Sequence, residues 1–206
     1  MLLREYLQNI HQVPDQDIEL ALGHFYLEEF DKGAYYLREG QYTHKLSFVV
    51  SGLFRLFYQL DGMERNMLFF TEHQFMGDYF GYLTQKPSVR PIQALEDAVV
   101  YSINRPELNQ LFDRSKSWER IGRLLAESAY LTSVHRANRL LHDDYDTRLT
   151  TFVEEHPGLL QRVPQYMIAS YLNMTPETLS RVKKRLMTDR SVKGSIHDDL
   201  EWPGTS

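Results

Sequence analysis

The chain has 206 residues, of which 42% are hydrophobic and 25% are charged, and its formal net charge at pH 7 is −5. A chain of this length can bury a substantial core in one or two domains, and its acidic balance gives no overall sign of a nucleic-acid partner. The sequence contains no cysteine, which excludes disulfides, thiolate metal sites and cysteine-ligated iron–sulfur clusters.

The first 30 residues are expected to be mostly helical. Leu3, Leu7 and Ile10 share one helical face, and Pro14 interrupts this pattern before a second segment, Asp15–Phe30, which we interpret as helix followed by coil. Charged residues lie where a signal peptide would need an apolar run, and no later stretch approaches ~18 uninterrupted apolar residues. We therefore expect a cytoplasmic protein without a membrane partner.

Short runs of β-branched and aromatic residues, punctuated by glycine, follow between residues 31 and 103. Four of these runs predict strands, and Asp61-Gly62 predicts a hairpin turn. The predicted strands are Lys45–Ser51, Leu53–Leu60, Arg65–Thr71 and Ala98–Ile103. Regular short strands with turn signals between them indicate a β-sandwich or a β-roll.

A β-rich domain of this kind could also be a small metal-dependent enzyme of the cupin type. That function needs clustered ligands, whereas His44 and His73 are isolated in the sequence, without an HxH pair or a nearby acidic ligand. The sequence also lacks a glycine-rich phosphate loop ending in GKS or GKT, and it lacks a GxSxG nucleophile motif. We therefore expect neither a catalytic site nor a metal site.

A long helical pattern extends from about Asn104 to His142 and carries two apolar seams. One seam contains Leu124, Leu131, Val134 and Leu141, and the neighbouring seam contains Trp118, Ile121 and Leu125. Such a helix can face its own β-rich domain and a partner chain at the same time. The alternative is a long helix that is buried within one monomer.

A further helix is predicted between Asp143 and Leu160, closed by His156-Pro157-Gly158, and two short helices with a tight turn follow. In the first short helix, Pro164 suits the first helical position. Asn173 can take the left-handed conformation that ends a helix. The apolar stripe of this helix consists of Met167, Ile168, Tyr171 and Leu172.

The second short helix has a clear start and two distinct sides. Thr175 can cap free backbone amides, and Pro176 suits the first helical position. The apolar side contains Leu179, Val182 and Leu186, and the polar side contains Glu177, Ser180, Arg181 and Lys184. These are the parts of a helix-turn-helix, whose second helix enters the major groove of DNA. An ordinary helical hairpin is the alternative.

Positive charge is concentrated in this second helix and just after it. The cluster contains Arg181, Lys183, Lys184, Arg185, Arg190 and Lys193, with Asp189 as the only acidic residue among them. A basic patch on an acidic protein is a local electrostatic footprint for nucleic acid, and the alternative is a solvated helix face. Two short strands about Gly194 would form a wing.

The run from Ile168 to Arg181 resembles the helix-turn-helix of the Crp/Fnr regulator family. The glycines at positions 33, 40, 52, 62 and 77 also fall where the β-roll of that family tends to have them. The resemblance implies an α+β chain with a jelly-roll β-roll domain at residues 1–112, a dimerisation helix at 113–142 and a winged helix-turn-helix at 143–206. It also implies a homodimer that binds double-stranded DNA, with RNA polymerase as a further partner.

The resemblance also indicates two sets of site residues. The expected DNA-binding residues are Thr175, Glu177, Thr178, Ser180, Arg181, Lys184 and Arg185. The expected effector-binding residues are Gly77, Asp78, Ser88, Val89 and Arg90. Relatives that bind cyclic AMP carry a Gly-Glu pair and an Arg-Ser pair at the latter positions, and this chain has no matching Arg-Ser pair. We therefore expect that cyclic AMP is not the effector, and no cofactor is assigned.

The sequence thus predicts a DNA-binding transcription regulator that acts as a dimer on pseudo-palindromic sites. Glu177 and Arg181 are expected to read base edges, because glutamate can accept from cytosine and arginine can bridge guanine O6 and N7. Lys184 and Arg185 are expected to hold phosphates. The alternative function is a cyclic-nucleotide or small-ligand sensor that does not bind DNA.

Overall fold

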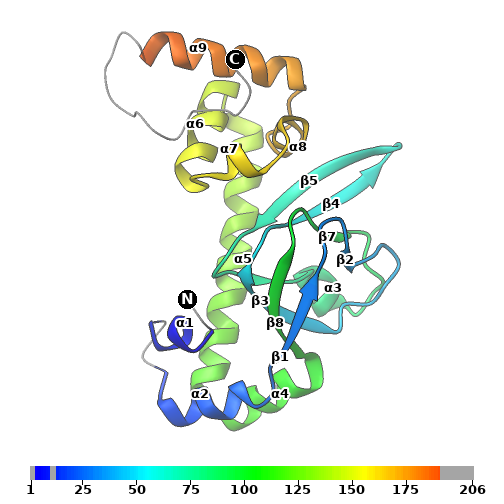
Figure 1. Ribbon diagram of the computed structural model, residues 1–206, viewed down its shortest axis with the longest axis vertical. Coiled ribbons are helices and arrows are strands. Elements are labelled where there is room, and N and C mark those ends of the chain that lie inside the picture. Colours follow the sequence, from blue (N-terminus) through cyan, green and yellow to red (C-terminus); the bar gives the residue numbers. More distant parts are fainter. Residues whose placement is uncertain (1–2, 10–12, 191–206) are drawn as a thin grey trace. The chain divides into compact units, whose positions relative to one another are not determined.

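The computed structural model describes residues 3–9 and 13–190 (Figure 1). The chain divides into two compact units, of which the first comprises Met1–Gly62 and Met67–Leu131 and the second Met63–Asn66 and Thr132–Ser206. The predicted wing about Gly194 lies outside the described residues. Among the described helices, none is both long enough and apolar enough to cross a membrane.

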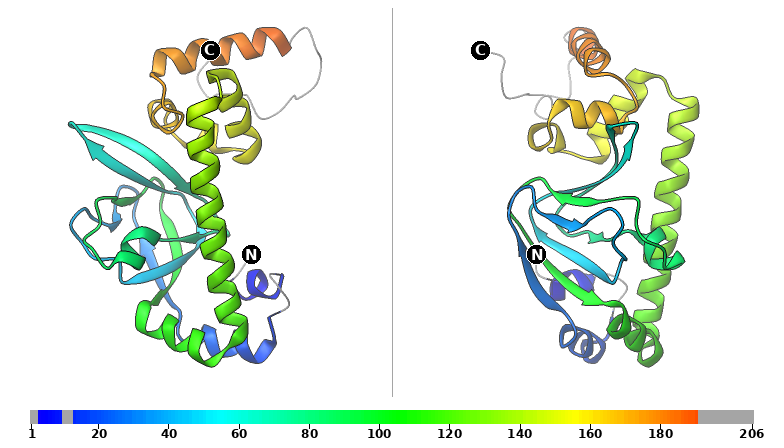
Figure 2. Two further views of the ribbon diagram at one scale, coloured as in Figure 1. Left: turned by 180° about the vertical axis from the view of Figure 1, so that it is seen from behind. Right: turned by 90° about the vertical axis from the view of Figure 1, so that its right-hand side faces the viewer.

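Within residues 3–9 and 13–190, two four-stranded sheets form the centre of the first unit, and of their strands only residues 63–66 belong to the second unit. The first sheet has the order β1-β8-β3-β6, and the second has the order β2-β7-β4-β5. Strands β1 and β8 pair antiparallel and lie side by side in both views of Figure 2. The strands are β1 (Tyr26–Phe30), β2 (Tyr35–Leu37), β3 (Lys45–Ser51), β4 (Phe54–Leu60), β5 (Met63–Phe70), β6 (Phe75–Met76), β7 (Ile92–Ala94) and β8 (Ala98–Asn104).

The first sheet has apolar side chains on both of its faces. Val49 and Val100 belong to a core with Phe54 and Ile92 of the second sheet. Phe48, on the opposite face of β3, belongs to a second core cluster with residues of four helices. These helices are α1 (Leu3–Asn9), α2 (Asp15–Leu22), α4 (Arg105–Arg114) and the first part of α5 (Lys116–His142).

The β-rich domain expected from the sequence is confirmed, and several of its strands were predicted closely. β3 has the predicted bounds, and β4, β5 and β8 each lie within two residues of theirs. Asp61 and Gly62 have φ values of 51° and 74°, as a two-residue hairpin turn requires. The predicted coil up to Phe30 is wrong, because residues 26–30 form β1 and pair with β8.

The predicted helix from Asn104 to His142 is interrupted at Ser115. Ser115 has an extended backbone, with φ −136° and ψ 116°, between α4 and α5. Its hydroxyl accepts from the Trp118 amide at 3.2 Å and donates to Asp17 at 2.8 Å. A serine in this position caps the new helix, so the chain can change direction without leaving these amides unpaired.

Up to residue 190, the second unit contains the start of β5, the end of α5 and four further helices. They are α6 (Tyr145–Glu155), α7 (Leu159–Arg162), α8 (Gln165–Tyr171) and α9 (Pro176–Arg190). Asp144 caps α6 by accepting from the Thr147 amide at 2.8 Å. Leu149 and Phe152 of α6 are buried, as are Ile168 of α8 and Leu179 of α9. Amphipathic helices of this length gain most of their stability from such a shared core.

Candidate DNA-binding and effector sites

Helices α8 and α9 are joined by a turn that has the predicted conformation. Asn173 has a φ of 54°, which confirms the expected left-handed residue. The Met174 amide donates to the Ala169 carbonyl at 2.9 Å, and the Met174 side chain is buried. Thr175 Oγ1 accepts from the Thr178 amide at 3.2 Å, so it caps α9 as expected. Pro164 differs from the prediction, since it lies just before α8 with a non-helical ψ of 139°.

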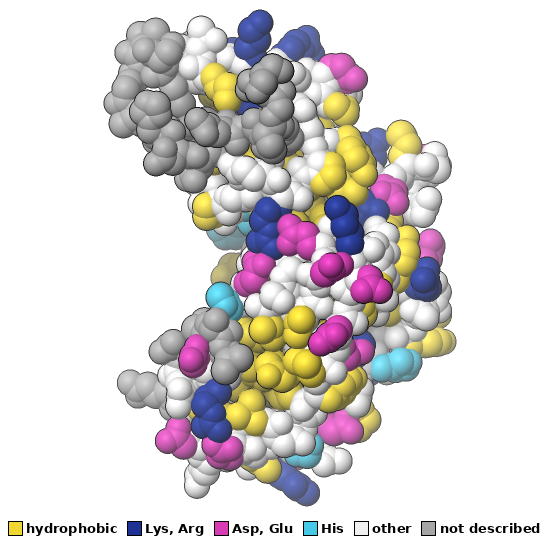
Figure 3. Space-filling view, viewed as in Figure 1, with side chains coloured by type: hydrophobic (Ala, Val, Ile, Leu, Met, Phe, Trp, Pro, Cys, Tyr) yellow, Lys and Arg dark blue, Asp and Glu magenta, His cyan; other side chains and the backbone are white. Residues whose placement is uncertain are grey.

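Helix α9 buries one side and exposes the other. Leu179 and Val182 are buried, and Leu186 is half-buried. The polar side is exposed over Glu177, Ser180, Arg181 and Lys184. Basic side chains project from α9 at the top of Figure 3. The predicted docking and outward sides are thus the ones that the structure has.

The polar groups at the start of α9 are held by local hydrogen bonds. Hydrogen bonds from its own backbone amide and from the Thr175 hydroxyl hold the pKa of Glu177 below its usual range. Arg181 donates from Nη2 to Thr178 Oγ1 at 3.2 Å. Thr178 is half-buried, and its hydroxyl holds the guanidinium of Arg181 in place. A charged carboxylate and a guanidinium therefore stand one turn apart on the exposed side.

Arg185 has a partner that the sequence did not reveal. Its Nε donates to Asp146 Oδ2 at 2.9 Å, and its Nη2 pairs with Asp146 Oδ1. Asp146 belongs to the first turn of α6, where a carboxylate also interacts favourably with the helix dipole. The guanidinium expected to hold a phosphate is thus bound to a carboxylate of the same unit.

Arg148 connects three backbone carbonyls around the helix-turn-helix. Its guanidinium donates to Asp143 O at 3.1 Å, to Leu140 O at 3.0 Å and to Leu172 O at 3.2 Å. Leu172 directly follows α8, where the turn begins, and Leu140 lies in the last turn of α5. The sequence did not predict this role of Arg148, because every residue has a backbone carbonyl and the residue types therefore do not reveal such partners.

Ser170 of α8 contacts the first residues of β5, which belong to the same unit. Its hydroxyl accepts from the Asn66 amide at 3.0 Å and donates to the Glu64 carbonyl at 3.0 Å. The Asn66 side chain donates to the Met167 carbonyl at 3.3 Å and is buried. The first helix of the pair is therefore fixed by polar contacts as well as by its apolar stripe.

The predicted effector residues lie together around α3 (Tyr79–Thr84) in the first unit. Asp78 precedes α3, and Ser88 and Arg90 follow it and bind the Asp78 carboxylate. Gly77 adjoins Asp78 in the chain and packs near Leu46. Val89 is 53% exposed and does not share the buried position of its neighbours. The structure thus brings together four of the five predicted residues and leaves the Val89 side chain outside.

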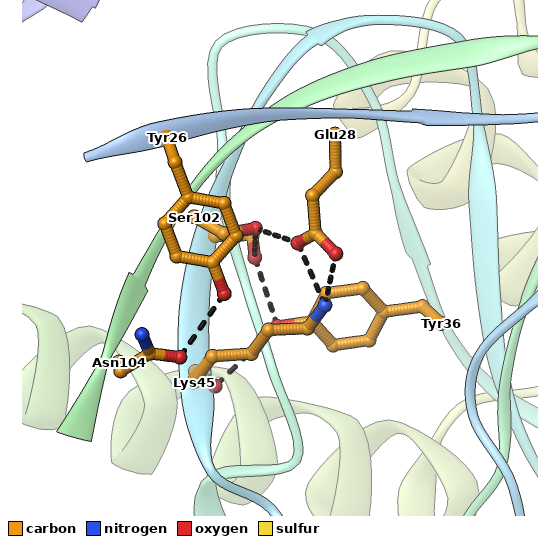
Figure 4. A network of polar contacts seen from close by, with 7 residues as sticks. Tyr26, Glu28, Tyr36, Lys45, Ser102 and Asn104 are labelled. Atoms are coloured by element: carbon orange, nitrogen blue, oxygen red, sulfur yellow. Dashed lines mark hydrogen bonds and ion pairs between the residues drawn. The ribbon is translucent and has the colours of Figure 1, made fainter.

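A second group of polar side chains lies on β1, β2, β3 and β8 (Figure 4). Lys45 Nζ contacts both carboxylate oxygens of Glu28 at 2.6 and 2.7 Å, and Ser102 also donates to Glu28. Burial raises the pKa of the Tyr36 phenol, which shares a 2.9 Å hydrogen bond with Ser47. An open cavity of about 460 Å³ lies beside this network, and its lining includes Tyr36 and Lys45.

The chain matches one known domain family and is similar in structure to several solved proteins. Residues 27–115 match the cyclic nucleotide-binding domain family. The chain is similar to FixK2 from Bradyrhizobium japonicum, with 19% identity, a TM-score of 0.70 and coverage of 80% of this chain and 85% of that chain. It is similar to the c-di-GMP responsive global regulator CLP of Xanthomonas campestris, with 21% identity, a TM-score of 0.65 and coverage of 85% and 93%. No curated protein matches the chain.

A further neighbour is a Eubacterium rectale protein that is assigned to the Crp/Fnr family of transcriptional regulators. It gives a TM-score of 0.67 at 14% identity, with coverage of 90% of this chain and 88% of that chain. The chain has the Crp/Fnr fold. The part of this Crp/Fnr fold that matches the cyclic nucleotide-binding domain runs from β1 through α4 and includes Gly77 to Arg90. Within residues 3–9 and 13–190, no group of three or more histidines and acidic residues could hold a metal ion.

Proposed function

We propose that the chain is a sequence-specific DNA-binding transcription regulator. The observation that carries this proposal is the exposed polar side of α9, which a capped and internally anchored turn presents to solvent. Such a helix fits the major groove, where side chains can reach base edges. The similar proteins support the proposal, since one is named a global regulator that links cell-cell signaling to virulence gene expression and another is assigned to the Crp/Fnr family of transcriptional regulators.

Within this proposal Thr175 and the residues of α9 have separate roles. Glu177 and Arg181 read base edges, and Thr175, Thr178 and Ser180 contact the DNA around them. Lys184 and Arg185 hold phosphates, which supply affinity without sequence preference. Arg185 must first exchange Asp146 for a phosphate, and an exposed ion pair of this kind costs only ~0–1 kcal/mol to break.

The regulator acts as a homodimer in this proposal, paired through α5. Leu131 is 52% exposed and Leu141 is 76% exposed on a 27-residue helix. With Leu124 and Val134 they repeat at the heptad spacing of a helix–helix seam. Two-fold symmetry then places half-sites about one helical turn, ~34 Å, apart on the DNA. The proposed domains are 1–112 for the β-roll, 113–142 for dimerisation and 143–206 for DNA binding.

The proposed regulator works in the cytoplasm, where promoter DNA and RNA polymerase are its partners. Fluorescence anisotropy with labelled genomic promoter duplexes tests the DNA-binding function. The proposal expects binding that weakens steeply with salt, with a preference for some duplexes over others. A variant with both Arg181 and Lys184 changed to alanine should lose the preference and part of the salt dependence. Equal binding of the wild type to every duplex would refute sequence-specific regulation.

A further inference from the structure

The segment from Gly77 to Arg90 holds a buried anion of its own. The Asp78 side chain is 1% exposed, and the Arg90 side chain that pairs with it is 15% exposed. Ser88 is buried and donates its hydroxyl to Asp78 Oδ2 at 2.7 Å, while Arg90 contacts Oδ1. The guanidinium and the hydroxyl at this place in the fold are therefore both bound to a carboxylate that the chain supplies.

An anionic ligand would need the same two donors. A phosphate, like a carboxylate, is held best by the planar fork of an arginine together with hydroxyl or amide donors. To release Arg90 and Ser88, the Asp78 carboxylate would have to remain buried without its partner, which is strongly unfavourable. The residues as they are arranged do not fit the cyclic phosphate that the domain match implies.

Gly81 of α3 makes room for this arrangement. A Cβ atom at position 81 would lie 2.5 Å from Asp78 Oδ2 and 2.9 Å from Thr43 Oγ1, which is closer than side-chain contacts allow. Thr43 is 4% exposed, and its hydroxyl has no hydrogen-bond partner within the described residues. The glycine thus lets the carboxylate turn inward, and a further unused donor lies near the same point.

We propose that Asp78 is a built-in anion that takes the place of a ligand phosphate in the β-roll, so that the regulator binds DNA without a cyclic nucleotide. DNA binding without a cyclic nucleotide rests on the proposed function, whereas the role of Asp78 concerns the β-roll alone. Removing the charge of Asp78 should turn the closed cluster into a site for an external anion, because Arg90 and Ser88 stay in place.

Calorimetric titration of the full chain with inorganic phosphate and with cyclic AMP tests the anion directly. The wild type should give no binding heat at millimolar ligand. Asp78→Asn keeps the shape of the side chain and removes its charge, and it should bind phosphate at least about tenfold more tightly than the wild type, a change of ~1.4 kcal/mol. The matched control is Asp97→Asn, because Asp97 is an exposed acceptor for the Lys32 amide in the same unit. This control should behave as the wild type does.

Gly81→Ala is a second variant that acts on the same carboxylate without changing the charge. The added methyl group should push Asp78 outward, so the Gly81→Ala variant should also bind phosphate more tightly than the wild type. This variant replaces Asp78→Asn in the test if Asp78→Asn does not fold. Micromolar binding of cyclic AMP by the wild type would overturn the proposal. Folded variants that bind phosphate no better than Asp97→Asn would also overturn it.

Independence of DNA binding from cyclic AMP is tested separately by measuring DNA affinity with and without cyclic AMP. The proposal expects one binding curve under both conditions, and a curve that tightens with cyclic AMP contradicts it. A wild type that fails to bind DNA under either condition refutes the proposed function instead. The phosphate titrations then still decide whether Asp78 is a built-in anion.

Discussion

Arg185 of α9 binds the carboxylate of Asp146 on α6, through a 2.9 Å contact between Nε and Oδ2 and a second contact between Nη2 and Oδ1. The side chains are 57% and 32% exposed, so water and salt screen the pair. An arginine in this situation can leave its carboxylate for a phosphate at small cost. Asp146 thus competes with the DNA backbone for the guanidinium of Arg185.

Removing this competitor should tighten DNA binding. Asp146→Asn removes the carboxylate that competes with phosphate for Arg185, and because an exposed pair contributes ~0–1 kcal/mol, affinity should rise by up to about fivefold for all sequences alike. Fluorescence anisotropy with two unrelated duplexes measures the effect. The control is Glu127→Gln, which makes the same charge change at the exposed pair with Arg123 on α5. An equal gain in DNA affinity from Glu127→Gln would show that the effect comes from the net charge and not from the release of Arg185.

The exposed apolar seam of α5 should hold two chains together. Leu131→Lys puts a charge into the seam and should convert a dimer into a monomer at micromolar concentration, because a charge is costly in a buried helix–helix contact. Light scattering measures the mass. Leu83→Lys is the matched control, since Leu83 is also a leucine with 58% exposure but lies on α3. A wild type with the mass of a single chain would refute the seam as an interface.

Arg148 should stabilise the unit that contains the helix-turn-helix. Arg148→Met keeps much of the side-chain length but leaves the carbonyls of Leu140 and Leu172 without this donor. We expect a loss of about 1–3 kcal/mol in the free energy of unfolding, as for unsatisfied, partly buried polar groups. Urea denaturation measures this free energy of unfolding. Arg123→Met, which breaks an exposed pair within one helix, should cost only ~0.2–0.5 kcal/mol, and a similar loss in both variants would contradict the role of Arg148.

His156 should make the stability of the second unit sensitive to mild acid. Burial against Phe152 and Tyr171 lowers the pKa of the His156 imidazole, and the Glu155 carboxylate only partly opposes this. The unfolded chain binds the proton first as the pH falls below ~6.5, so stability is lost between that value and the lower folded pKa. His156→Gln should reduce the drop in urea midpoint between pH 7.5 and 5.5. The exposed His135→Gln should leave the drop unchanged, and equal drops in all three proteins would contradict the assignment.

The features that the sequence predicted well depend on local rules. Asn173 and Thr175 were predicted because a left-handed helix end and a helix cap each require particular residue types at one position. The outward side of α9 follows from helical periodicity alone, which is why Glu177 and Arg181 are exposed as expected. β3 was predicted with its bounds because its apolar run ends at Ser51, directly before Gly52, which has a φ of 94°.

The features that the sequence did not predict depend on partners far along the chain. Residues 26–30 form a strand only because β8 pairs with them, and their two glutamates weaken the strand pattern. The Arg148 contacts with backbone carbonyls and the Arg185 pair with Asp146, 39 residues away, leave no spacing to recognise. The Asp78–Arg90 pair was also missed, although both residues were predicted for the same site, because residue types alone do not show whether two opposite charges face a ligand or each other.

Sequence-specific DNA binding as a dimer is best tested by selecting bound duplexes from a random-sequence library with the purified full-length chain. We predict enrichment of two inverted half-sites with centres about one helical turn, ~34 Å, apart. Arg181→Ala should lose the preference at one position of each half-site, where a bidentate arginine contact is worth ~1–3 kcal/mol. A library that emerges without any enriched sequence would contradict sequence-specific binding, and one enriched only in single half-sites would contradict binding as a dimer.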